Sequence, residues 1–324
     1  MQVIHNLELY RDIMGNAVTT PVVQVGSGAP HVVMVALQHG WELIGLDTGL
    51  QVMQQCAPIG TLTLISVASP SAFQDSTRFT AASLDPQSRQ TTNLNRVHPG
   101  QPDGTLAGQS AWAIDQYIQS LRPDAVIDLH AYAGQSVPHA IVDTCESELQ
   151  QQLHDWMHNS KIVWYREYEG EDFASQSLDG ALSAIWVRRG IPSVTVEHGP
   201  LRSFSPQQSL HAQQTLRNIL ISFGAIKGKI TRAIPDTLAN HIWQRHEIIY
   251  GGSAAGYLRP IVSIHGSVKQ GDVLAHIVVP SGEIAGTVSA PADGVHFIWH
   301  DEYRIAPGSL VGVMLTRYEP HKSQ

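Results

Sequence analysis

The sequence of 324 residues has only two cysteines, Cys56 and Cys145, and only 15% of its residues are charged. Two cysteines cannot build a disulfide framework, which argues against a disulfide-rich secreted scaffold and makes a reducing compartment, the cytoplasm, our expectation. No apolar run is long enough to cross a membrane. The N-terminal residues contain no basic region followed by an apolar stretch, so we expect no signal peptide and no membrane partner.

Positive charge is also scarce, because 20 Lys and Arg residues stand against 28 Asp and Glu residues, for a formal net charge of −8. A nucleic-acid-binding surface needs clustered basic residues, so we expect no nucleic-acid partner. The hydrophobic content of 43% is sufficient for a large core. The length exceeds that of one ordinary domain, which predicts a globular protein of two domains.

Strands and helices alternate in the first part of the chain. Short apolar runs predict buried strands, and amphipathic segments between them predict helices. The predicted strands lie at residues 22–25, 31–37, 61–67, 124–130, 139–143, 161–168 and 192–197. The predicted helices lie at 42–56, 106–121, 146–159, 178–189 and 206–223, the last with Ser205 as its cap. This order predicts an α/β fold with a mostly parallel, mixed sheet flanked by helices.

Two segments depart from this alternation. Residues 68–108 are rich in Ser, Pro, Gln, Asn and Gly. This segment of roughly forty residues predicts a long loop of the kind that is often functional. After residue 224, Gly, Val and Ile alternate with polar residues in short predicted strands. We therefore predict an α/β domain at residues 1–228 and a smaller all-β domain at residues 229–324.

Three of the predicted buried strands end in ionisable residues: His39 with Glu42, then His130, then Glu197. The carboxyl ends of parallel strands lie along one edge of a sheet, where ligands bind in open α/β folds, so these side chains should converge. Two His and one Glu form a three-ligand zinc site with the fourth position open, as in catalytic sites. Glu197 is then available as a general base for water activated by the metal.

Each of these residues also has a simpler explanation. His39 precedes a glycine and could be a turn residue, and Glu197 could pair with an arginine. Asp128 and His130 alternate with Leu129 along one strand, so both could face the same side and either could be the ligand. Taken singly, each residue is better explained as structural, whereas the three strand ends together favour the metal site.

The long polar segment contains two groups suited to a substrate. Arg78 ends the stretch SPSAFQDSTR, and Asn95 and Arg96 lie in NLNRVHPG, just before a Pro-Gly turn. A guanidinium binds a carboxylate in a bidentate way, an asparagine amide adds a donor, and an arginine can stabilise the oxyanion of a tetrahedral intermediate. The alternative is a solvated loop with scattered charges.

Four motifs in this order, HGWE, NLNRVHPG, DLH and SVTVEHG, resemble the succinylglutamate desuccinylase/aspartoacylase family of zinc carboxypeptidase-like deacylases. The sequence looks nearest to the predicted deacylases that include N-acetyl-diaminobutyrate deacetylase. The resemblance covers nearly the whole chain, since the all-β part is similar to the barrel-like C-terminal domain of the family. That domain could cover the mouth of the active site or form the contact of a homo-oligomer.

The resemblance implies one Zn²⁺ per chain, bound by His39, Glu42 and His130, with Glu197 as general base and acid. The implied activity is that of a zinc-dependent hydrolase of linear amides, a deacylase that removes the acyl group from a small N-acyl amino acid. The rival functions are a zinc carboxypeptidase acting on peptides and a catalytically silent, metal-dependent binding protein.

The resemblance also assigns roles in the long polar segment. Arg78 matches the arginine that polarises the scissile carbonyl, and Asn95 and Arg96 match the pair that holds the substrate carboxylate. The sequence departs from the family at His98, where Phe is usual, and at Ser69, where Asn usually precedes the proline. Both departures lie beside the predicted carboxylate-binding turn, so they concern the substrate and not the metal.

Overall fold

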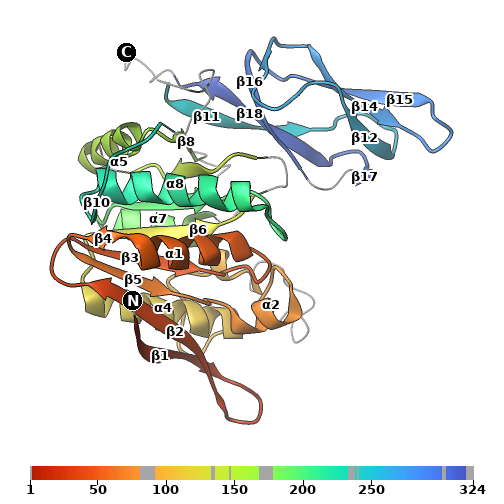
Figure 1. Cartoon of the computed structure of the whole chain (residues 1–324). Helices are drawn as coiled ribbons and strands as arrows, with labels where there is room; N and C mark the ends of the chain where they lie inside the picture. The colour runs from red at the N-terminus through yellow and green to blue at the C-terminus, as the bar shows by residue number, and fades with distance from the viewer. Residues whose placement is uncertain are drawn as a thin grey trace.

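The computed structural model describes residues 2–80, 92–132, 136–145, 147–167, 178–232, 238, 241–300 and 304–318. Strands of these residues form a large mixed sheet (Figure 1). In sheet order its strands are β1 (Gln2–Arg11), β2 (Ala17–Gly26), β5 (Thr61–Ile65), β3 (His31–Ala36), β6 (Ala125–His130), β9 (Ser193–Glu197), β7 (His139–Val142), β8 (Val163–Arg166), β11 (Trp243–Ile249), β18 (Leu310–Arg317), β16 (Gly294–Trp299) and β13 (Ser267–Val268). Helices flank this sheet, as the sequence predicts.

The centre of the sheet is parallel, because β5, β3, β6 and β9 lie side by side in the same direction. Strand β3 divides its side chains between two cores: Val32 and Met34 face one, and Val33 and Val35 face the other. All four are fully buried. This burial on both faces explains the unbroken apolar run of the strand.

Helices cover both faces of the parallel centre (Figure 1). The helices that pack on one face are α1 (Leu43–Gln55), α5 (Ser147–Ser160) and α8 (Pro206–Ser222), and those on the other are α4 (Leu106–Leu121) and α7 (Leu182–Arg188). Helix α8 begins as predicted, because Ser205 and Gln208 form a capping box that satisfies two of its first backbone N–H groups. None of the described helices has the length and apolar content needed to cross a lipid bilayer.

Short elements fill parts that the sequence predicts differently. These are α2 (Pro70–Asp75), the 3-10 helices η1 (Leu94–Arg96) and η2 (Leu178–Gly180), and the paired strands β4 (Ala57–Pro58) and β10 (Ile226–Lys227). The expectation of a long loop after residue 68 is therefore wrong where α2 and η1 form, while residues 81–91 of that loop lie outside the described residues. Pro70 favours the start of α2 through its fixed φ, and the side chain of Asn93 caps η1, so local interactions order both turns. The helix predicted at 178–189 is divided into η2 and α7.

The C-terminal part is a β region, as predicted, and its strands pair mostly antiparallel. Strand β11 pairs in parallel with β8 and continues the large sheet into β18, β16 and β13. The second sheet consists of β15 (Ile284–Ser289), β14 (Val273–Val278), β12 (Gly256–Pro260) and β17 (Arg304–Ile305). A hydrophobic core that includes Leu274 and Ile277 of β14 and Trp299 of β16 connects the two sheets. The border between residues 228 and 229 stays a prediction, and strand pairing crosses it.

Candidate active site

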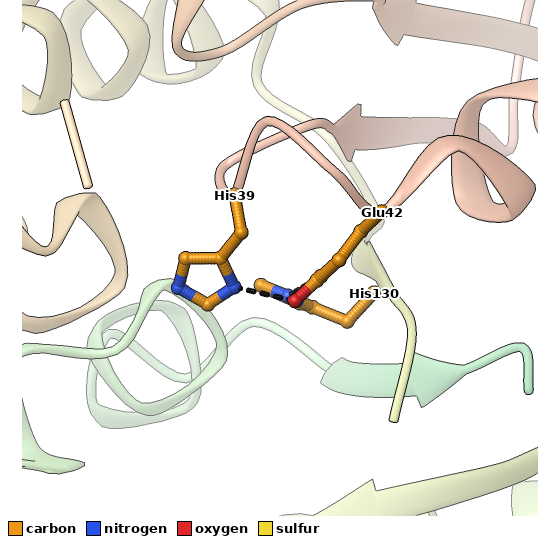
Figure 2. Close-up of side chains that lie close together, drawn as sticks. All are labelled: His39, Glu42 and His130. Atoms are coloured by element: carbon orange, nitrogen blue, oxygen red, sulfur yellow. Dashed lines mark hydrogen bonds and ion pairs between the residues drawn. The ribbon is translucent and has the colours of Figure 1, made fainter. Parts of the chain in front are cut away.

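Three buried side chains meet where β3 and β6 end. His39 and Glu42 follow β3, and His130 is the last residue of β6 (Figure 2). Nδ1 of His39 lies 2.8 Å from one carboxylate oxygen of Glu42, and Nδ1 of His130 lies 2.7 Å from the other. One potential ligand atom from each residue lies within 4.8 Å of the others. The structure thus gathers the three residues predicted as metal ligands into a group that could hold a metal ion.

The loop that carries His39 is fixed by close backbone packing. A side-chain carbon on Gly40 would lie 1.9 Å from the carbonyl oxygen of Ala72, so only glycine fits between β3 and α2. The N–H of Gly40 donates to the carbonyl of Thr77 at 2.9 Å. This packing and this hydrogen bond fix the position of the turn after β3 relative to the polar segment that contains Arg78.

Each histidine is held from behind through its other ring nitrogen. Nε2 of His39 lies 3.0 Å from Oδ1 of Asn93, and Nε2 of His130 lies 2.9 Å from Oδ2 of Asp128. Donation of the Nε2 protons to these oxygens leaves both Nδ1 atoms directed at Glu42, an arrangement typical of metal-binding histidines. Asp128 and His130 do face the same side of β6, and His130 is the one that meets Glu42.

The electrostatics of the group suit a cation. Burial would raise the pKa of Glu42, but the two imidazoles outweigh it and hold that pKa well below its ordinary value. Burial, helped by nearby Arg78, lowers the pKa of His39 to about 4, so its imidazole is neutral at neutral pH, as metal binding requires. Burial acts in the same direction on His130, but the carboxylates of Asp128 and Glu42 raise its pKa well above the usual value. A metal ion would replace the proton that these carboxylates attract.

Glu197 lies on β9, directly opposite His130 in the parallel pairing of β6 and β9. It is almost fully buried, lines the same cavity, and has one carboxylate oxygen without a hydrogen-bond partner among the described residues. Burial raises the pKa of Glu197 to about 8; His130 opposes this rise and Glu42 adds to it. The carboxyl group can therefore gain and lose a proton near neutral pH.

The residues predicted to contact substrate lie close to the metal-binding group. Nη1 of Arg78 lies 3.9 Å from Glu42, and 36% of the Arg78 side chain is exposed. Asn95 has its amide nitrogen 3.0 Å from Nε2 of His130 and its amide oxygen on the first backbone N–H of α7. Arg96 donates to the carbonyl of Asn95 at 2.7 Å. All three line the cavity, and their roles toward a substrate stay predictions.

The cavity has a volume of about 480 Å³ and extends from His39, Glu42 and His130 to β11. Arg245 of β11 donates to the hydroxyl of Tyr132 at 2.8 Å and to Glu247 at 3.0 Å, and it lies 3.6 Å from Glu167. Arg245 could not be predicted from the sequence, because only the pairing of β11 with β8 brings the C-terminal part to this cavity. Nothing in the local sequence around residue 245 signals it.

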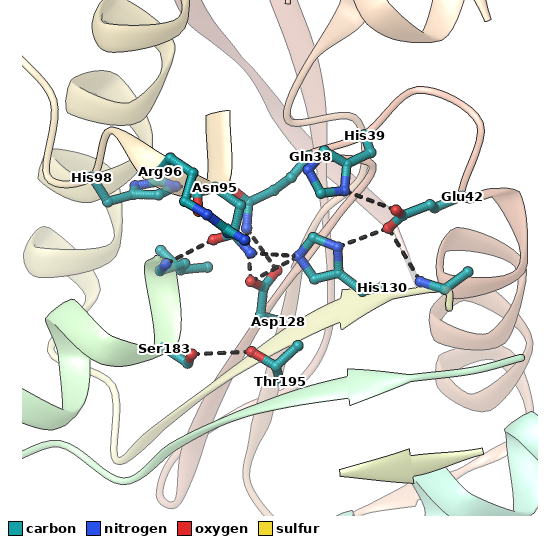
Figure 3. Close-up of polar contacts among 12 residues, drawn as sticks. Gln38, His39, Glu42, Asn95, Arg96, His98, Asp128, His130, Ser183 and Thr195 are labelled. Atoms are coloured by element: carbon teal, nitrogen blue, oxygen red, sulfur yellow. Dashed lines mark hydrogen bonds and ion pairs between the residues drawn. The ribbon is translucent and has the colours of Figure 1, made fainter. Parts of the chain in front are cut away.

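Asp143, just after β7, is a further carboxyl on the cavity wall, 5% exposed. Burial raises its pKa to about 7, while a hydrogen bond from Ser183 opposes that rise. Ser183 in turn accepts a hydrogen bond from Thr195 at 3.0 Å (Figure 3). The hydrogen bonds of Ser183 and Thr195 thus hold the carboxyl group of Asp143 in place.

These features define an α/β protein with a polar cavity, at the ends of β3, β6 and β9, that contains a group able to hold a metal ion. The family model of the succinylglutamate desuccinylase/aspartoacylase catalytic domain matches residues 28–223. The chain belongs to this family, which contains deacylases of small N-acyl amino acids. The resemblance inferred from the four motifs is thereby confirmed.

Relatives agree with this assignment. The N-alpha-acetyl-L-2,4-diaminobutyric acid deacetylase of Halomonas elongata is 26% identical over 212 residues, which are 63% of this chain. The match spans 59% of the length of that relative.

Solved structures share the fold over almost the whole chain. The product-bound ectoine utilization protein EutE (DoeB) of Ruegeria pomeroyi has a TM-score of 0.78 and 21% identity, with 96% of this chain and 93% of that chain covered. An aspartoacylase family protein of Mesorhizobium loti has a TM-score of 0.75 and 21% identity, with 97% and 94% covered. The α/β fold with a C-terminal β region is therefore confirmed.

Proposed function

We propose that this protein is a zinc-dependent amidohydrolase that removes the acyl group from a small N-acyl amino acid. The observation that carries the proposal is the buried group of His39, Glu42 and His130, with the unpaired carboxylate oxygen of Glu197 in the same cavity. Two imidazole nitrogens and a carboxylate suit Zn²⁺ with an open position. Fe²⁺, Co²⁺ and Mn²⁺ also accept these donors, so the metal has to be measured.

When bound, the metal would polarise the amide carbonyl and acidify a water molecule. Glu197 would take the proton of the attacking water and deliver it to the leaving amine, which its pKa of about 8 allows in both directions near neutral pH. Arg78 would stabilise the negative charge that develops on the carbonyl oxygen, because its guanidinium lies 3.9 Å from Glu42 at the edge of the same group.

Arg96, with Asn95 beside it, would bind the carboxylate of the amino acid. The guanidinium is permanently charged and lines the cavity, and Asn95 holds the turn that directs it. The cavity of about 480 Å³ has the size of a small-molecule site, which favours an acyl amino acid over a long peptide.

The test is metal analysis of the purified protein followed by a panel of N-acyl amino acids and short peptides. We expect one metal ion per chain and release of a free amino acid from an acyl amino acid. Faster cleavage of peptides would favour a carboxypeptidase. A zinc-loaded protein that hydrolyses no member of the panel would overturn the proposal in favour of a binding protein.

A further inference from the structure

A row of buried polar side chains leads from His130 away from the metal-binding group (Figure 3). Nε2 of Gln38 lies 2.8 Å from each carboxylate oxygen of Asp128, which itself contacts His130. Nε2 of His98 lies 2.8 Å from Oε1 of Gln38. Gln38 and Asp128 are 0% exposed and His98 is 4% exposed. Because these side chains are buried, leaving one of their donors or acceptors without a partner would cost free energy.

The order of donors and acceptors in this row is determined from its two ends. The amide NH₂ of Gln38 donates to both oxygens of Asp128, so the amide oxygen faces His98. His98 then has to carry its proton on Nε2. Burial lowers the pKa of His98 to about 4, so the ring is neutral and carries one proton at neutral pH. The other nitrogen, Nδ1, has no hydrogen-bond partner among the described residues.

We propose that His98 and Gln38 are positioning residues of the metal site. His98 sets the orientation of the Gln38 amide, Gln38 holds both oxygens of Asp128, and Asp128 presents Nδ1 of His130 to the metal. This inference rests on the proposed function, because it needs a metal at His39, Glu42 and His130. It assigns a role to two residues that contact neither the metal nor the substrate.

The glutamine amide explains why His98 matters at this distance. The two ends of an amide have almost the same shape, so packing alone does not choose between them, and the hydrogen bond from His98 does. Without that donor, the buried amide oxygen loses its partner, and rotation of the amide would place an oxygen against Asp128. Repulsion between these oxygens would then turn the carboxylate away from His130.

The test measures the affinity of the metal-free protein for Co²⁺ by competition with a chelator, together with the visible spectrum of the Co²⁺ protein. His98→Phe keeps a flat ring and removes the donor, and we expect about 10-fold weaker binding and a changed spectrum. His98→Gln returns an N–H near the position of Nε2 and should restore affinity to within about threefold of wild type, on the premise that the donor and not the ring is required. His296→Phe, the same change at a fully buried histidine of β16, is the matched control and should leave Co²⁺ affinity unchanged.

A double-mutant cycle with Gln38→Met separates positioning from simple packing. If His98 acts through Gln38, His98→Phe should cause no further loss of Co²⁺ affinity in the Gln38→Met background. Equal losses in both backgrounds would overturn the inference, as would a folded His98→Phe protein with wild-type affinity and spectrum.

Gln38→Met alone provides a second route if His98→Phe does not fold. It removes the amide donor that faces Asp128, so wild-type Co²⁺ affinity in this folded variant would also refute the inference. Failure of the wild-type protein itself to bind Co²⁺ would instead refute the proposed function, and the inference with it.

Discussion

Asp143→Asn isolates the cost of burying one carboxyl group in the cavity wall. Asp143 is 5% exposed, and burial is the largest cause of the rise of its pKa from 3.8 to about 7. The carboxylate of Glu167 adds to this rise, and the hydrogen bond from Ser183 opposes it. Asparagine has the same size, can still accept from Ser183, and cannot ionise.

The sign follows from proton binding in the two states. Between pH 3.8 and about 7, the folded wild-type protein holds a proton on Asp143 that the unfolded chain has released. This group therefore makes the free energy of unfolding fall as pH rises through that window. A difference of about three pKa units corresponds to about 4 kcal/mol. Relative to wild type, the free energy of unfolding of Asp143→Asn should be almost unchanged at pH 4 and higher by about 4 kcal/mol at pH 8.

Urea unfolding of both proteins at several pH values between 4 and 8 measures this difference. Other groups titrate in the same range, but they are common to both proteins and cancel in the comparison. Parallel stability profiles would show that Asp143 is ionised at little cost in the fold and would refute the reasoning. Asp115→Asn is the matched control: Asp115 is equally buried but paired with Arg189, so its loss should lower stability at neutral pH.

Three further predictions concern the site. Glu197→Gln should lower kcat by roughly 10²–10⁴-fold while metal analysis still finds one ion per chain, since Glu197 is proposed as a base and not as a ligand; loss of the metal would reverse that assignment. His39→Ala should abolish stoichiometric zinc together with activity, and retained zinc in this variant would remove His39 from the ligand set. Gly40→Ala should lower the free energy of unfolding by about 1–3 kcal/mol or more, because the new methyl group would lie 1.9 Å from the carbonyl oxygen of Ala72. An unchanged urea midpoint would show that the loop around Gly40 can move to accommodate the methyl group without a loss of stability.

The parallel centre of the fold could be predicted because its local patterns and its tertiary surroundings agree. Strand β3 is apolar on both faces since two helical layers cover it, and α8 has a cap and a proline at its start. The sequence pattern predicts only residues 22–25 of the N-terminal hairpin, which consists of β1 and β2. Most side chains of β1 are exposed at the edge of the sheet, so the strand has no apolar alternation to reveal it.

The residues of the site could also be predicted only in part. His39, Glu42, His130 and Glu197 lie at or just after the ends of predicted strands, and the rule that parallel strands end at one edge was enough to bring them together. The supporting contacts could not be predicted, because they cross between distant segments whose register is set only in the folded sheet. Gln38 and His98 are 60 residues apart, and neither belongs to a local pattern that signals pairing.

The parallel pairing of β11 with β8 has a consequence for attempts to shorten the protein. Removing everything after residue 228 would take away one of the two strands that pair with β8 and leave unsatisfied backbone groups beside Tyr165 and Arg166, both of which are buried in the complete fold. An exposed edge strand of this kind promotes self-association, so we expect the fragment to aggregate. The same truncation would remove Arg245 from the cavity lining, so a minimal version of this protein should be designed around the complete sheet and not around the matched family segment alone.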